Sequence, residues 1–141
     1  MRKDINLYGL WENKEDIKKA GYIVVFEAEK SVLKRDSRND STCVALEGHA
    51  MSDEQVRVIL GTGVREVIIA MDKDVLLEEV WNMCEKFYGL RRISYIYDRW
   101  GILGDKDSPA DLPNKLYNFM FKWRIPYTEA EHTKYIEKLK K

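Results

Sequence analysis

The sequence predicts an α/β protein whose mainly parallel four-stranded sheet is flanked by helices and followed by a C-terminal helical tail. Short apolar runs rich in β-branched and aromatic residues recur without polar alternation, which is typical of strands covered on both faces. A segment with helical periodicity separates each run from the next, as parallel strands require. The 141 residues, 45% of them hydrophobic and 34% charged, are enough for one soluble domain with its own core.

The expected elements follow from these patterns and from capping residues. The predicted strands are Tyr22–Phe26, Thr42–Leu46, Glu66–Met71 and Arg92–Tyr97. The predicted helices are 13–19, with Asn13 as N-cap and Gly21 as stop, 30–34 before a polar loop over 35–41, 53–60 capped by Ser52, and 76–88. Pro113 begins the tail, and Thr128 caps its last helix. We therefore expect a domain over residues 1–112, with a short lead-in helix, and an extension over 113–141.

Composition excludes several classes of protein. With 24 basic and 24 acidic side chains, the formal net charge is +0, which argues against a protein that holds nucleic acid by bulk charge. No apolar run reaches the roughly 20 residues of a membrane span. Two distant cysteines, Cys43 and Cys84, and a charged N-terminus without a signal core favour a cytoplasmic protein that does not enter a membrane.

Acidic residues follow three of the predicted strands. Glu27 follows the first strand and Asp72 and Asp74 follow the third; Asp105, Asp107 and Asp111 lie in the loop after the fourth. The carboxyl ends of parallel strands meet at one edge of a sheet, so these carboxylates are expected to converge there. Crowded carboxylates raise one another's pKa unless a cation lies between them. Oxygen ligands suit Mg²⁺ or Mn²⁺, and side chains two apart in extended backbone, such as Asp72 and Asp74, point the same way.

Such a site suits phosphoryl transfer. A metal ion held by Glu27, Asp72, Asp74 and Asp107 neutralises phosphate charge and activates a hydroxyl, while Glu27 can instead serve as general base. Further contacts with phosphate or nucleic acid are assigned to Lys30, Lys73, Asp105 and Asp111. A solvated turn stays an alternative for Asp105 and Asp111, and a plain helix-start cation for Lys30. Among the tryptophans, only Trp100, beside these acids, is a candidate for base stacking.

Four segments resemble the Toprim domain, and within that superfamily the sequence most resembles the Toprim domain of bacterial and phage DNA primases. The segments are Ile23–Lys30, Val44–Gly48, Ile68–Asp74 and Lys106–Asp111, and the resemblance covers about 5–112. It implies a Rossmann-like fold, a catalytic Glu27, a metal-binding pair in Asp72 and Asp74, and a further acid at Asp107 with Asp111 behind it. The chain departs from the family pattern at Ala28, usually glycine, and at Ser31, often aspartate in primases.

The resemblance also implies a function and partners. We expect the catalytic domain of a DNA primase, a nucleotidyltransferase that makes RNA primers from nucleotides on a DNA template and meets a replicative helicase through regions outside this chain. A primase also has a zinc-binding domain and a basic lobe before Toprim, so this piece is expected to be inactive alone, in a bacterial cell or phage-infected host. The alternatives are a stand-alone Toprim nuclease and a non-catalytic α/β interaction module.

Overall fold

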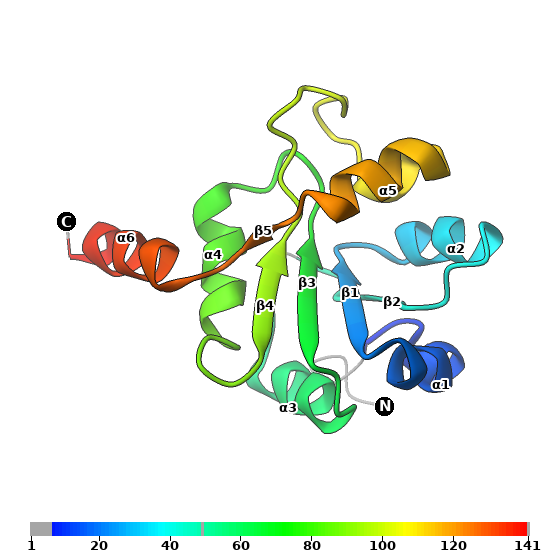
Figure 1. The fold of residues 1–141 in the computed structure, drawn as a ribbon, viewed down its shortest axis with the longest axis horizontal. Coiled ribbons are helices and arrows are strands. Elements are labelled where there is room, and N and C mark those ends of the chain that lie inside the picture. The colour runs from blue at the N-terminus through cyan, green and yellow to red at the C-terminus, as the bar shows by residue number, and fades with distance from the viewer. Residues whose placement is uncertain (1–6, 49, 141) are drawn as a thin grey trace.

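The structure is a computed structural model that describes residues 7–48 and 50–140, and it contains one five-stranded sheet (Figure 1). The strands are β1 Tyr22–Phe26, β2 Cys43–Ala45, β3 Glu66–Ala70, β4 Arg92–Tyr95 and β5 Ile125–Pro126. The helices are α1 Leu10–Ala20, α2 Glu29–Ser37, α3 Asp53–Gly61, α4 Leu77–Glu85, α5 Asn114–Lys122 and α6 Glu129–Leu139, with a 3₁₀ turn, η2, over Pro109–Asp111.

The strand order is β2-β1-β3-β4-β5, and the first four strands are parallel. This confirms the predicted α/β class with a mainly parallel sheet. The sheet has one strand more than predicted, because β5, within the expected helical tail, pairs antiparallel with β4. Ile125 and Pro126 alone are too short a run to signal a strand, and proline is tolerated there because β5 is an edge.

The sheet separates two apolar cores, which explains the unbroken apolar runs. In β1, Ile23 and Val25 face a core shared with α3 and α4, whereas Val24 and Phe26 face a core shared with α2 and α5. All four side chains are completely buried. A strand covered on both faces has no solvent side on which polar residues could alternate.

Two of the three capping predictions are confirmed. Ser52 forms a capping box with Gln55 at the start of α3, and Thr128 forms another at the start of α6. The prediction for Asn13 is wrong: α1 begins at Leu10, and Asn13 lies buried inside it. Its amide donates to the Cys43 carbonyl at 3.0 Å, so the residue ties α1 to β2 instead of capping a helix.

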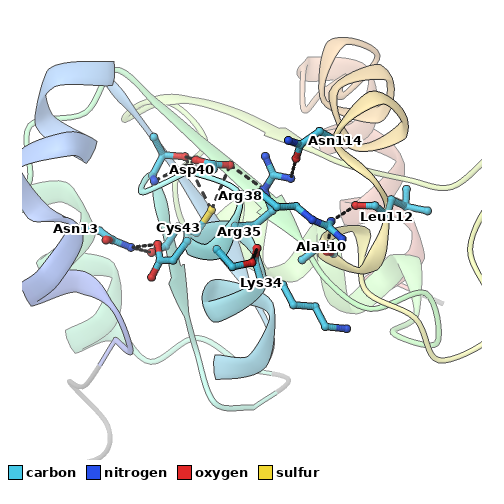
Figure 2. A network of polar contacts seen from close by, with 12 residues as sticks. Asn13, Lys34, Arg35, Arg38, Asp40, Cys43, Ala110, Leu112 and Asn114 are labelled. Atoms are coloured by element: carbon cyan, nitrogen blue, oxygen red, sulfur yellow. Dashed lines mark hydrogen bonds and ion pairs between the residues drawn. The ribbon is translucent and has the colours of Figure 1, made fainter.

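A buried arginine joins α2 to α5. The predicted polar loop over 35–41 is wrong at its start, because α2 continues to Ser37. Figure 2 shows Arg35 between Asp40 and Asn114, with hydrogen bonds of 2.9 and 3.0 Å, and its guanidinium lies 3.6 Å from the centre of the Tyr117 ring. Arg38 donates to the carbonyl groups of Ala110 and Leu112. These contacts attach the segment after β4 to the helix after β1.

Gly9 begins α1 in a conformation that side chains rarely adopt, with φ of 86°. A Cβ there would lie 2.9 Å from Val32 Cγ1 and 3.2 Å from the Cys43 carbonyl oxygen. We expect Gly9→Ala to lower the free energy of unfolding by about 2 kcal/mol, measured by urea unfolding. Gly63→Ala is the control: φ is 77° but no atom lies within 4 Å, so the loss should be about 1 kcal/mol. Equal losses would show that contact with Val32 costs nothing.

Among the described residues, no helix has the length and apolar character needed to cross a membrane.

Candidate metal centre

The topology brings the ends of β1 and β3 together. From β1 the chain crosses to β2 on one side, whereas β3 and β4 lie on the other side. The switch in direction therefore falls between β1 and β3, which is where ligands bind in open α/β sheets. Phe26 pairs with Ala70 at the last position of the two strands, so Glu27 and Asp72 both follow at the carboxyl edge.

Three carboxylates converge at this edge. One oxygen from each of Glu27, Asp72 and Asp74 lies within 4.8 Å of the other two. Glu27 and Asp72 are half-buried and Asp74 is exposed, so the cluster opens to solvent on the side of Asp74. The Oδ1 atom of Asp72 is buried and has no hydrogen-bond partner among the described residues. The site therefore holds an oxygen ready to accept a ligand.

The electrostatics of the cluster favour a cation. Burial is the largest cause that raises the pKa of Asp72, to about 6, and the charge of Glu27, a hydrogen bond with it and the charge of Asp74 act in the same direction. Lys30, in the first turn of α2, partly offsets them by lowering the pKa. Hard divalent cations take carboxylate oxygens as ligands and are compatible with this donor set.

Lys73 lies between the two aspartates in sequence, but its ammonium points to the loop after β4. Its Nζ lies 3.1 Å from Asp98 Oδ2 and donates to the Leu103 carbonyl at 2.9 Å. Asp98 also accepts hydrogen bonds from the amides of Ile102 and Leu103 at 3.0 and 2.8 Å. Although burial alone would raise the pKa of Asp98, these amides and Lys73 hold it below its usual value.

Asp98 is a structural residue of the site that sequence reasoning missed. An aspartate at the start of a glycine-containing loop can accept hydrogen bonds from backbone amides a few residues further on. This pattern in the sequence could have identified Asp98. A cavity of about 110 Å³ lies next to this loop, bounded by Asp72, Asp98 and mainly apolar side chains such as Leu103. The Lys73–Asp98 pair therefore fixes the loop against the segment that carries Asp72 and Asp74.

The other predicted site residues lie outside the three-carboxylate cluster. The Asp107 carbonyl accepts from the Lys73 amide at 2.9 Å, which places its loop beside Asp72, but its carboxylate accepts from the Gly104 amide at 3.0 Å. Asp111 pairs with Lys34 and accepts from the Ser108 amide at 2.9 Å. Burial opposes the shift, yet these two partners lower the pKa of Asp111. Asp105 is exposed in a turn, and Lys30 is exposed on α2.

Comparison with known proteins gives one related sequence. No protein-family model matches the chain. The SPbeta prophage-derived uncharacterized protein YorJ of Bacillus subtilis (strain 168) is 34% identical over 127 residues, and the match covers 76% of this chain and 33% of that protein. The chain thus spans about a third of the length of the curated relative it matches.

Solved structures show the same fold. A DNA primase domain from Pseudomonas aeruginosa superimposes with a TM-score of 0.78 and 19% identity, over 95% of this chain and 43% of that one. A DnaG primase catalytic domain bound to ssDNA superimposes with a TM-score of 0.73 and 19% identity, over 89% of this chain and 41% of that one. The RNA polymerase domain of Mycobacterium tuberculosis DnaG, in complex with a double-stranded DNA oligomer with an overhang, superimposes with a TM-score of 0.67 and 20% identity. The match covers 89% of this chain and 41% of that one.

Proposed function

Because this chain has the Toprim-containing fold of the DnaG primase catalytic core, we propose that it is the metal-dependent catalytic domain of a DNA primase. The observation that carries the proposal is the position of Glu27, Asp72 and Asp74 around one point at the switch in the sheet. In the reaction, a primer hydroxyl attacks the α-phosphate of an incoming ribonucleotide and pyrophosphate leaves.

The cation would be Mg²⁺ or Mn²⁺, held by Asp72, Asp74 and Glu27. When bound, it supplies positive charge that neutralises phosphate oxygens and lowers the pKa of an attacking hydroxyl. The buried Oδ1 of Asp72, which has no partner among the described residues, is the donor best suited to hold it. Asp107 would join from the loop beside Lys73 if its carboxylate leaves the Gly104 amide.

The protein's own side chains would transfer protons and position the reacting groups. Glu27 accepts or orients the proton of the primer hydroxyl from the end of β1, a general base fixed by a buried strand. Lys30 is exposed in the first turn of α2 and lowers the pKa of Asp72, so it is available to a phosphate oxygen. Lys73 would act indirectly, because its bond to Asp98 positions the loop that carries Asp107. Asp105 and Asp111 are left as peripheral contacts with nucleic acid.

Binding of metal to the apo-chain tests this proposal. We expect titration with Mn²⁺ or Mg²⁺, followed by calorimetry at pH 7.5, to show saturable binding at millimolar concentrations or below. Asp72→Asn should weaken it about a hundredfold or more, because it removes a charged ligand from the centre. Asp16→Asn, an equal change of charge on the exposed face of α1, should leave it unchanged.

Two results would contradict the proposal. Absence of divalent binding at millimolar concentrations would remove the metal centre. Robust metal-dependent cleavage of labelled oligonucleotides by the chain alone would identify a nuclease that uses the same acids with water as nucleophile. The proposed domain is instead expected to make little primer until it is joined to a region that binds template.

The same proposal includes the bounds of the domain, its partners and its location in the cell. Residues 1–112 would form the Toprim domain and 113–141 an extension. Template DNA and nucleotides would be the partners, as the primase structures with single- and double-stranded DNA suggest. A replicative helicase would bind elsewhere on the full protein, in the cytoplasm. The prophage origin of the relative supports a primase of phage type.

A further inference from the structure

An exposed group of aromatic rings lies on the loop after β4 and along α5, outside the three-carboxylate cluster. Trp100, Phe119 and Trp123, here called the aromatic platform, are 36%, 39% and 50% exposed. The rings of Trp100 and Phe119 meet edge to face with their centres 4.9 Å apart. Together with Arg99, the three residues line an open groove of about 430 Å³. Three large rings exposed side by side are unusual on a protein surface without a binding role.

The platform carries positive charge although the whole protein is neutral. The Arg99 guanidinium lies 4.8 Å from the centre of the Trp100 ring, and Arg99 Nη2 donates to the Trp123 carbonyl at 3.1 Å. Lys122 Nζ lies 5.8 Å from the Trp123 ring. Arg99 and Lys122 are both exposed, whereas the nearby Arg124 is paired with Glu66 at 2.8 Å. The surface therefore combines flat rings with two exposed cations, Arg99 and Lys122.

The platform is connected to the candidate centre by a fixed loop. Arg99 and Trp100 directly follow Asp98, which pairs with Lys73, the residue between Asp72 and Asp74 in the sequence. Figure 1 shows this loop and α5 at the same end of the sheet as the carboxyl ends of β1 and β3. A strand lying on the platform would therefore lie at the edge of the sheet where the carboxylates converge.

We propose that the aromatic platform binds single-stranded DNA by stacking bases on Trp100 and Trp123, with Arg99 and Lys122 on the neighbouring phosphates. Base faces are available for stacking in a single strand, whereas a duplex hides them. Cations among exposed rings suit a polyanion better than an apolar protein surface. The inference rests on the proposed function only in its choice of DNA as the natural strand.

Fluorescence anisotropy of a labelled 20-nucleotide oligo-dT, in low salt and EDTA, tests the platform in the intact chain. We expect Trp100→Ala and Trp123→Ala each to weaken binding about fivefold or more. Trp100→Phe should retain most of the affinity, because a ring remains, but should lose part of the tryptophan quenching that DNA causes. Trp11→Ala is the matched control, since Trp11 is 85% exposed on α1 and belongs to no ring cluster among the described residues.

The outcomes separate the platform from the metal centre. EDTA removes the metal, so failure of the proposed metal site leaves this result intact. Oligo-U of equal length tells whether RNA shares the platform. Unchanged affinity in both alanine variants, binding of duplex that is equally tight and equally sensitive to Trp100→Ala, or a Trp100-dependent dimer without DNA binding would each overturn the inference. Thermal unfolding confirms that every variant is folded.

Discussion

We expect Asp72→Asn to abolish the stabilisation that divalent metal gives to this protein. A ligand that binds only the folded state, at a concentration a hundred times its Kd, adds about 2.7 kcal/mol to the free energy of unfolding. Wild type should gain this amount in saturating Mn²⁺, and the variant should gain almost nothing, because its amide replaces the charged ligand. Urea unfolding with and without metal, with Asp16→Asn as the control for charge, measures the difference.

Without metal the same variant should be the more stable protein at neutral pH. The pKa of Asp72 is raised from 3.8 to about 6, so the folded state binds a proton more tightly than the unfolded state does. The resulting stabilisation is complete below pH 3.8 and is lost as the pH rises through about 6. At pH 7.5 the charged carboxylate therefore lowers the stability of wild type. We expect Asp72→Asn to gain about 1 kcal/mol there, since Asp72 is only half-buried and solvent screens its charge.

The gain should disappear at pH 4, where wild type carries the proton. Metal and proton compete for Asp72, so the affinity for Mn²⁺ should fall steeply below pH 6 in wild type. A gain of stability that is equal at pH 4 and pH 7.5 would show that the variant acts through packing instead of charge.

The second large effect is expected at Arg35. Arg35→Ala should lower the free energy of unfolding by about 3 kcal/mol, because the side chain is 4% exposed and its loss removes the guanidinium that donates to Asp40 and Asn114. The Tyr117 ring also loses the guanidinium stacked 3.6 Å from its centre. Urea unfolding followed by circular dichroism gives the value.

Two further variants separate the causes of that loss. Arg35→Met keeps most of the apolar volume, so it should recover the part due to packing against Tyr117 but not the part due to Asp40. Arg57→Ala removes an exposed arginine paired with Glu54. It should lower the free energy of unfolding by less than about 0.5 kcal/mol, because solvent screens the charges of a surface ion pair. A loss at Arg35 no larger than at Arg57 would refute the structural role of the α2–α5 junction.

The fold could be predicted from the sequence wherever a local pattern had only one stable solution. The run from Ile23 to Phe26 has no polar side chain, so it had to be buried on both faces, and the structure places it between β2 and β3. Ser52 followed by Gln55 satisfies two backbone amides locally, and the helix starts there. Local signals failed where the partner is distant in sequence. Asn13 resembles a cap, but its partner is the Cys43 carbonyl, and β5 exists only because β4 is beside it.

The sequence by itself determined that acids follow buried parallel strands, because strand pattern and residue type are both local. Only the tertiary structure decided which acids meet. The order of the strands places β1 beside β3, so Glu27, Asp72 and Asp74 converge. The carboxylate of Asp107 is held instead by the Gly104 amide, and that of Asp111 by the Ser108 amide and by Lys34 on α2. The physical reason is that each carboxylate accepts hydrogen bonds from the donors that lie near it, and the packing of segments distant in sequence decides which donors those are.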